Sequence, residues 1–343
     1  MISFEPACLP TALGSLPIVD PTEACRLMTQ SFPAIPVWPQ LPKRTYLENM
    51  YVQFSEGLPG GVLAEERVYV NSHQVDTALE ALYTAYLAED IDAGAISPTY
   101  AAGLACFLEL KEVLAGCTAV KGQVTGPISL GLQVTDQNRR PILYDDVLAD
   151  ALVKHLQLKA RWQERALRKL CKQTVVFLDE PYLSSIGSAY LALREEQVIA
   201  CLEEVLQGIS GLKGLHCCGN TDWGLLLNLP IDIVSFDAYN YAMHLSLYSD
   251  SLKPFLQRGG IVAWGIVPNT AESLARESTV SLIERLLTAM GLLVDKGIAL
   301  DKLIEQSLIT PSCGLGTLPV DIADAVCAQT AAVSQTMRAR YLR

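Results

Sequence analysis

The sequence predicts an α/β fold, a (β/α)8 TIM barrel, built as a single domain over residues 1–343. Short apolar segments rich in β-branched residues recur along the chain, and a longer amphipathic segment follows most of them. Strands that alternate with helices indicate βαβ units, and roughly seven or eight such units favour a barrel over an open sheet. Polar residues also gather where the predicted strands end, and no internal linker or repeat divides the chain.

The predicted strands carry apolar residues without strict alternation, which is typical of parallel strands buried on both faces. They cover residues 11–19, 119–126, 174–181, 213–220, 231–240, 259–269 and 305–314. Amphipathic helices are predicted over residues 144–171, 190–209, 271–297 and 319–342. The first of these helices has an acidic start and a basic end, which complement the helix dipole. The Pro-rich segment 33–42 is predicted to be a loop, because the strand–helix pattern resumes directly after it.

Charge and composition argue against several classes of protein. The formal net charge of −11 disfavours binding to nucleic acid or to anionic membranes, both of which attract basic surfaces. No apolar run is long enough for a transmembrane helix, and the first residues lack the pattern of a signal peptide. The ten cysteines are therefore expected to be reduced thiols in a cytoplasmic protein.

Metal-binding residue types follow several of the predicted strands. On a strand, residues two apart point to the same face, so His216 and Cys218 form a two-point clamp while Cys217 points into the core. Cys313 follows the last strand, and the carboxyl ends of barrel strands meet at one mouth. One nitrogen and two sulfurs are a ligand set that zinc prefers, and Asp237 could supply a fourth ligand.

Each of these patterns has a plainer interpretation. Cysteine is among the most buried residue types, so the thiols could be part of the core. The acidic pair of LDEP, residues 178–181, could complement a helix dipole, or Asp179 could hold a substrate ammonium in the barrel mouth. Ser15 could bind a substrate carboxylate or make a turn. The residues alone leave these alternatives open.

Six short motifs occur in the order found in one known family and span almost the whole chain. The motifs are LGSLP (13–17), KGQVTGP (121–127), FLDEP (177–181), LHCCGN (215–220), VSFDA (234–238) and PSCGLG (311–316). With them the chain resembles the C-terminal catalytic half of cobalamin-independent methionine synthase, within the uroporphyrinogen decarboxylase-like barrel superfamily.

The resemblance implies a zinc-dependent methyltransferase that makes methionine from homocysteine. It implies zinc ligands at His216, Cys218, Asp237 and Cys313, although the family usually has Glu in place of Asp237. It assigns Asp179 to the amino group of homocysteine and Ser15 to its carboxylate. A further family glutamate aligns approximately with residues 50–57, which makes Glu56 a candidate second contact to the amino group.

Two departures from the family concern the methyl donor. The chain has no room for the N-terminal barrel that helps to bind folate, and residues 125–136 lack the tryptophan on which the pterin stacks. A methyl-corrinoid, either methylcobalamin or a corrinoid protein, is therefore the expected donor. The alternatives are another thiol acceptor such as coenzyme M, a metal-free decarboxylase of tetrapyrrole carboxylates, and a non-catalytic zinc-binding protein.

Overall fold

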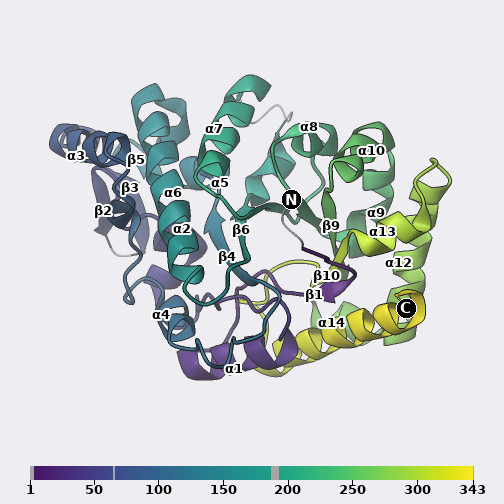
Figure 1. Cartoon of the computed structure of the whole chain (residues 1–343). Coiled ribbons are helices and arrows are strands. Elements are labelled where there is room, and N and C mark those ends of the chain that lie inside the picture. The colour runs from purple at the N-terminus through teal and green to yellow at the C-terminus, as the bar shows by residue number, and fades with distance from the viewer. Residues whose placement is uncertain (1–3, 65, 187–192, 343) are drawn as a thin grey trace.

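A curled parallel sheet forms the centre of the computed structural model, which describes residues 4–64, 66–186 and 193–342 (Figure 1). Seven strands are hydrogen-bonded in the order β1-β10-β9-β8-β7-β6-β4, and every neighbouring pair is parallel. The strands are β1 (Leu9–Pro10), β4 (Val120–Thr125), β6 (Thr174–Asp179), β7 (Leu212–Cys217), β8 (Ile233–Phe236), β9 (Ile261–Val267) and β10 (Ser307–Pro311). The predicted α/β class and the predicted parallel sheet are therefore confirmed.

The segment from Pro36 to Gln40 contacts both edges of this sheet. Isolated parallel bridges join Val37 to Lys121 of β4, and Gln40 to Ser15 beyond β1. The backbone N–H of Lys121 donates to Pro36 O, and the N–H of Gln40 donates to Gly14 O. The predicted loop over 33–42 thus runs between β1 and β4, the two edge strands of the sheet. Closure into a full eight-stranded barrel stays a prediction.

Six of the seven predicted strands lie where they were expected, each a few residues shorter. The strand predicted over residues 11–19 is misplaced, because β1 covers only Leu9–Pro10. Gly14 explains the difference, since its φ of 114° turns the backbone out of an extended path. A small second sheet was not predicted: β2 (Gly61–Ala64) and β3 (Arg67–Val70) form an antiparallel hairpin, and β5 (Thr135–Asp136) pairs with β3.

Helices surround the sheet, and the four predicted ones are present. They are α6 (Asp146–Leu167), α7 (Glu195–Gln207), α12 (Thr279–Val294) and α14 (Val320–Tyr341). Residues 190–192 of the predicted helix 190–209 lie outside the described residues, and the predicted helix 271–297 is divided into α11 (Ala271–Leu274) and α12. The remaining helices are α1 (Pro21–Ser31), α2 (Met50–Gln53), α3 (Asp76–Leu87), α4 (Ala102–Leu108), α5 (Pro127–Gln133), α8 (Trp223–Asn228), α9 (Ala238–Ser246), α10 (Ser249–Gln257) and α13 (Leu300–Glu305). Short 3-10 turns cover Tyr46–Glu48, Ile91–Gly94, Ile142–Tyr144 and Pro181–Ser185.

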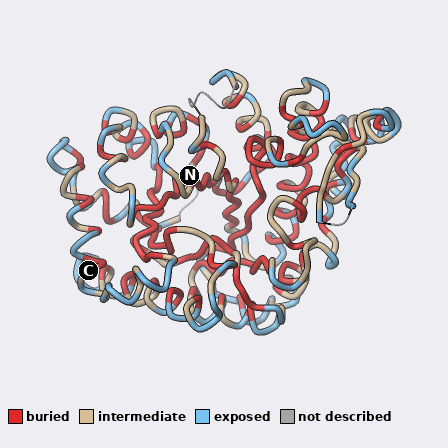
Figure 2. The backbone as a smooth tube through the Cα atoms, turned by 180° about the vertical axis from the view of Figure 1, so that it is seen from behind, coloured by how far each residue is buried: buried red, intermediate tan, exposed pale blue. Residues whose placement is uncertain are grey.

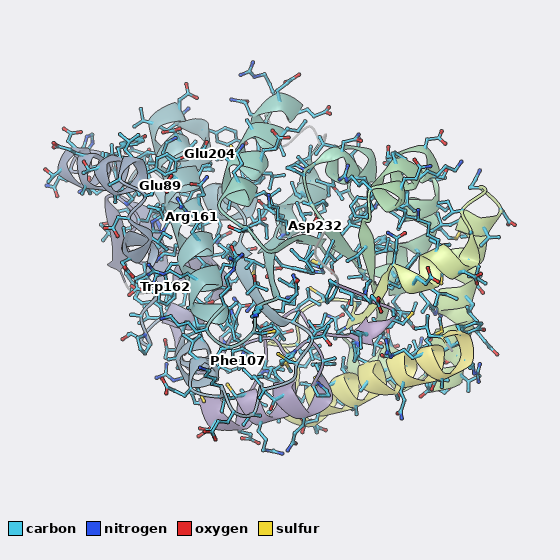
Figure 3. All side chains as sticks on the ribbon, in the orientation of Figure 1. Glu89, Phe107, Arg161, Trp162, Glu204 and Asp232 are labelled. Carbon is cyan, nitrogen blue, oxygen red and sulfur yellow. The ribbon has the colours of Figure 1, made fainter. Side chains whose placement is uncertain are left out.

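The longest of the early helices, α6, shows how local sequence sets these elements. Its start is fixed by Asp145, whose side chain accepts hydrogen bonds from the backbone N–H groups of Val147 and Leu148. On its outer side Arg161 lies 3.5 Å from Glu89, which follows α3 (Figure 3). No helix in the described parts of the chain is both long and apolar enough to cross a membrane.

Figure 2 shows that the strands of the central sheet are mostly buried. Successive side chains along each strand point to opposite faces, which separates an inner core from an outer one. Val175, Phe177 and Leu212 belong to an inner cluster enclosed by the sheet, whereas their neighbours pack against the helices. The same inner face continues upward to Asp179 on β6 and His216 on β7, which pair across the two strands. The sheet therefore delivers these two polar side chains to the mouth formed by the carboxyl ends of the strands.

Candidate metal centre and substrate pocket

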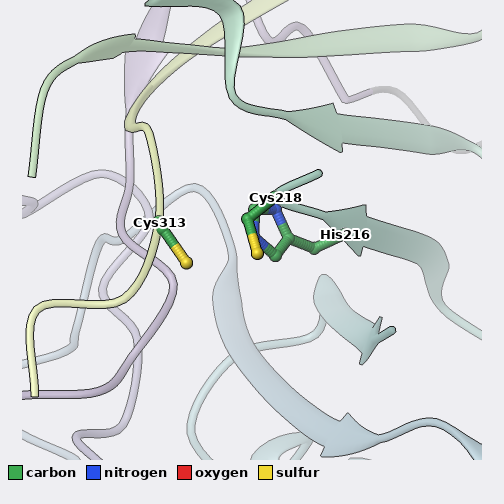
Figure 4. Close-up of side chains that lie close together, drawn as sticks. All are labelled: His216, Cys218 and Cys313. Carbon is green, nitrogen blue, oxygen red and sulfur yellow. The ribbon is translucent and has the colours of Figure 1, made fainter. Parts of the chain in front are cut away.

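Three potential metal ligands meet at the mouth of the sheet. His216 lies on β7, Cys218 directly follows that strand, and Cys313 lies in the turn after β10 (Figure 4). A ring nitrogen of His216 and the Sγ atoms of Cys218 and Cys313 lie within 4.8 Å of one another. The structure thus brings together the histidine and the two cysteines that the sequence singled out, although Cys313 lies far from the other two in the sequence.

The imidazole of His216 is oriented for a ligand. Its Nδ1 lies 3.0 Å from Ser235 Oγ on the neighbouring strand β8. Its Nε2 is buried and has no hydrogen-bond partner among the described residues. A buried polar atom without a partner is costly, and metal-binding histidines commonly use one ring nitrogen for the metal and the other for an orienting contact. The site therefore fits a metal at Nε2.

The two thiols of the cluster are electrostatically linked. A hydrogen bond with Cys313, aided by His216, lowers the pKa of the Cys218 thiol to about 4 despite burial. The same hydrogen bond, together with burial, raises the pKa of the Cys313 thiol. The pair thus favours one thiolate and one retained proton, and a divalent cation could take the place of that proton, because metals bind the thiolate form.

Cys217 and Asp237 do not belong to this cluster. Cys217 is buried in the outer core, and its thiol lies 3.6 Å from Gly219 O, as expected for the opposite face of β7. Asp237 caps α9 instead: its Oδ1 accepts the backbone N–H of Asn240 at 3.0 Å, and its Oδ2 accepts the Asn240 amide at 2.6 Å. Burial raises the pKa of Asp237, and these hydrogen bonds oppose that rise. The fourth ligand proposed from the sequence is therefore turned toward its own helix.

The acidic pair of the LDEP motif has two separate environments. Asp179 faces the mouth, and its Oδ1 is buried without a partner among the described residues. Burial raises the pKa of Asp179 to about 6, although the ammonium of Lys121 opposes this shift. Glu180 points the other way and accepts hydrogen bonds from the N–H groups of Ile128 and Ser129 at the start of α5. Asp179 therefore has the predicted orientation toward the mouth, whereas Glu180 caps a helix.

These groups line a cavity of about 230 Å³. It is bounded by Leu13, Ser15, Gln40, Pro42, Glu48, Asn49, Met50, Asp179, Pro181, His216, Cys218, Cys313, Gly314, Gly316 and Thr317. Ser15 is held against the turn that carries Cys313, because Leu315 N–H donates to Ser15 O at 2.9 Å. A Cβ on Gly316 would lie 2.2 Å from Ser15 Oγ, so only glycine permits this close approach.

Among the described residues, the glutamate that lines this cavity is Glu48. Its side chain is fully buried, Oε1 binds the Arg44 guanidinium at 2.7 Å, and Oε2 has no hydrogen-bond partner among the described residues. Burial raises the pKa of Glu48, and the hydrogen bond from Arg44 opposes that rise. Glu56, the residue suggested by the sequence, instead accepts the backbone N–H of Ser97 at 2.8 Å and is not among the described residues that line the cavity.

The sequence prediction missed Glu48 because this residue lies just before the aligned segment 50–57, in which Glu56 is the one acidic residue. Thr45 caps the 3-10 turn Tyr46–Glu48, and Asn49 caps α2 directly after it. These two capping residues are the signal that could have placed a turn, and hence a fixed side-chain direction, at Glu48 rather than at Glu56.

Proteins of known structure share the fold of this chain, whereas sequence comparison finds no relative. No protein-family model and no curated protein sequence matches the chain. Solved structures of similar fold include a B12-independent methionine synthase from Shewanella sp. W3-18-1 in complex with selenomethionine, with a TM-score of 0.61, 18% identity, and coverage of 98% of this chain and 99% of that chain.

Two further structures are similar. A candidate vitamin-B12-independent methionine synthase from Listeria monocytogenes has a TM-score of 0.58 at 13% identity, over 92% of this chain and 85% of that chain. A methyltransferase from Methanosarcina mazei has a TM-score of 0.57 at 11% identity, over 98% and 95%. At these identities the likeness establishes the architecture, and this chain therefore shares the fold of these methionine synthase and methyltransferase structures.

Proposed function

We propose that the protein is a zinc-dependent methyltransferase that makes methionine by moving a methyl group onto the thiol of homocysteine. The observation that carries the proposal is the cluster of His216, Cys218 and Cys313 at the wall of a cavity that also contains unpaired carboxylate oxygens. The three similar folds are methionine synthases or a methyltransferase, which supports the reaction class.

The metal would be held by His216 Nε2 and the sulfurs of Cys218 and Cys313. Zinc bound there would supply a Lewis acid that deprotonates a thiol whose ordinary pKa is about 8.5. Two thiolate ligands, from Cys218 and Cys313, would neutralise the charge of a divalent ion, so that a substrate sulfur beside them would keep its nucleophilic character. Asp237, the fourth ligand expected from the sequence, would bind the metal only if its carboxylate left Asn240.

The cavity offers a complementary group for each end of an amino-acid thiol. Asp179 and Glu48 carry carboxylate oxygens without hydrogen-bond partners among the described residues, and both could accept the substrate ammonium. The geometry thus favours Glu48 over Glu56 as the second carboxylate. Ser15 also lines the cavity, and its hydroxyl could donate to the substrate carboxylate. Binding at both ends would fix the sulfur toward the metal, which lowers the entropic part of the barrier.

The donor is proposed to be a methyl-corrinoid rather than methyl-folate. Helix α5, over Pro127–Gln133, carries no aromatic side chain beside the mouth on which a pterin could stack. The cavity of about 230 Å³ is too small for a corrin ring, so the donor would approach from outside, carried by a corrinoid protein. The chain would form one barrel domain, closed by residues 36–40. A cytoplasmic location would keep the two thiols reduced and available for the metal.

Two other functions are disfavoured by the lining of the cavity. A decarboxylase of tetrapyrrole carboxylates needs cationic side chains for several acetates, yet the described lining contains no lysine or arginine. A sulfonate acceptor such as coenzyme M would place a permanent anion near Asp179 and Glu48, which like-charge repulsion opposes. An amino-acid thiol brings an ammonium to the same place.

The proposal is tested with purified protein, methylcobalamin and homocysteine, with and without a strong chelator. Methionine should form only when zinc is bound, and coenzyme M should compete weakly. Robust turnover with methyl-folate and none with methylcobalamin would reject the assigned donor. Unchanged turnover after complete removal of metal would reject the mechanism.

A further inference from the structure

Asp237 and Cys218 start side by side at the mouth of the sheet. Strands β7 and β8 pair His216 with Ser235 and Cys217 with Phe236. The next positions along the two strands are therefore Cys218, a proposed metal ligand, and Asp237. The backbone thus places the Asp237 carboxylate close to the metal position, and only the direction of its side chain decides whether it binds.

Asn240 sets that direction. Its amide lies 2.6 Å from Asp237 Oδ2, and its backbone N–H donates to Oδ1 at 3.0 Å, so one residue engages both oxygens. The backbone contact is an ordinary helix cap for α9 and would persist with any residue except proline at position 240. The side-chain amide is an additional restraint that only Asn supplies at this length, and it holds the oxygen that the cap leaves unused.

We propose that Asn240 is a positioning residue that keeps the Asp237 carboxylate away from the metal, so that the fourth coordination position is open to the substrate thiol. The inference rests on the proposed function, because it requires a metal at the cluster. The net charge of the metal centre explains why an unbound carboxylate would be an advantage. A divalent ion and two thiolates form a neutral centre, whereas a bound carboxylate would make it anionic and would oppose the arrival of a third thiolate in a buried site.

The test compares the wild-type protein with Asn240→Leu, which has similar size but no amide. One readout is zinc affinity, measured by competition with a chromophoric chelator. The other is homocysteine affinity, measured from the visible spectrum of the cobalt-substituted protein. The variant should bind zinc about tenfold more tightly, because Asp237 becomes a ligand, and homocysteine about tenfold more weakly, since it must displace that ligand. Asn228→Leu, an exposed amide on α8, is the matched control and should change neither value.

A merely structural role for Asn240 would lower both affinities together, and that result would overturn the inference, as would no change in either. Asp237→Ala guards against misfolding caused by the leucine. It should retain zinc within about twofold of wild type, the usual scatter for independent effects, and should cancel the effect of Asn240→Leu in the double variant. A large loss of zinc in Asp237→Ala would mean that the carboxylate already binds in the resting protein. If wild type itself bound no metal, the proposed function would fail first; normal wild-type binding without the opposite shifts would reject only the role of Asn240.

Discussion

Ser235 Oγ lies 3.0 Å from His216 Nδ1, across the β7–β8 pair. Both residues are buried, so the hydroxyl fixes the ring without competition from solvent. With Nε2 on a metal, Nδ1 carries the proton and donates to the hydroxyl oxygen, which selects the tautomer required for binding.

Ser235→Ala should therefore weaken zinc binding by about tenfold while leaving the ligands in place. Ser235→Thr keeps the hydroxyl and should restore most of the affinity. Ser246→Ala, which removes a buried hydroxyl from the end of α9, is the matched control. Equal zinc affinities for Ser235→Ala and wild type would show that the contact does not orient the ring.

The two cysteines of the cluster should be indispensable for metal, and their neighbour should not. Cys218→Ser or Cys313→Ser is expected to lose stoichiometric zinc, because each removes one of three ligands. Cys217→Ala alters the adjacent residue but faces the outer core, so its zinc content should equal that of wild type. Metal analysis after dialysis decides the matter, and full zinc in either serine variant would refute the ligand assignment.

The sequence was informative wherever the strand period governed the outcome. The two-residue spacing of His216 and Cys218 predicted a shared face, and the structure places Cys217 on the other side. Polar residues at strand ends likewise predicted the meeting with Cys313, because parallel strands align their carboxyl ends.

Residues outside the regular elements were harder to place. The two-residue period of a strand does not predict the direction of the side chain that directly follows the strand. This side chain can turn toward the mouth or toward the next helix, and that of Asp237 turns to the helix and caps α9. The same limit applies to Glu48 and Glu56, which lie in a region of short turns. The strand predicted over 11–19 is absent there because Gly14, a single residue with positive φ, interrupts an otherwise extended segment.

Glu48 and Glu56 can be distinguished by substrate affinity. Glu48→Gln should weaken homocysteine binding by about tenfold, the typical effect of a lost hydrogen bond to a charged group, without altering zinc content. Glu56→Gln should change homocysteine affinity by less than about twofold, since its carboxylate contacts Ser97 and lies outside the lining. Isothermal titration of both zinc-loaded variants measures the difference, and the reverse order would restore Glu56 to the site.

His155 should make folding sensitive to acid. The ring is buried, its Nε2 lies 2.8 Å from Phe54 O, and burial lowers the pKa of His155 from 6.5 to about 3. Between these values the unfolded chain binds a proton that the folded protein excludes, so stability is retained above pH 6.5 and falls as the pH decreases toward 3.

The excluded proton on His155 should lower the free energy of unfolding by about 2 kcal/mol between pH 7 and pH 5. His155→Gln should lose that much of the pH dependence in urea unfolding, although it is less stable at neutral pH. His73→Gln, at an exposed histidine, should keep the wild-type dependence. Identical pH profiles for His155→Gln and wild type would contradict the assignment.

X-ray absorption at the zinc edge, before and after addition of homocysteine, tests the central claim most directly. An imidazole and two thiolates should give one nitrogen and two sulfurs in the resting protein, with one lighter ligand in the remaining position. Homocysteine should raise the sulfur count from two to three. A spectrum that homocysteine leaves unchanged would contradict the claim that this centre activates the substrate thiol.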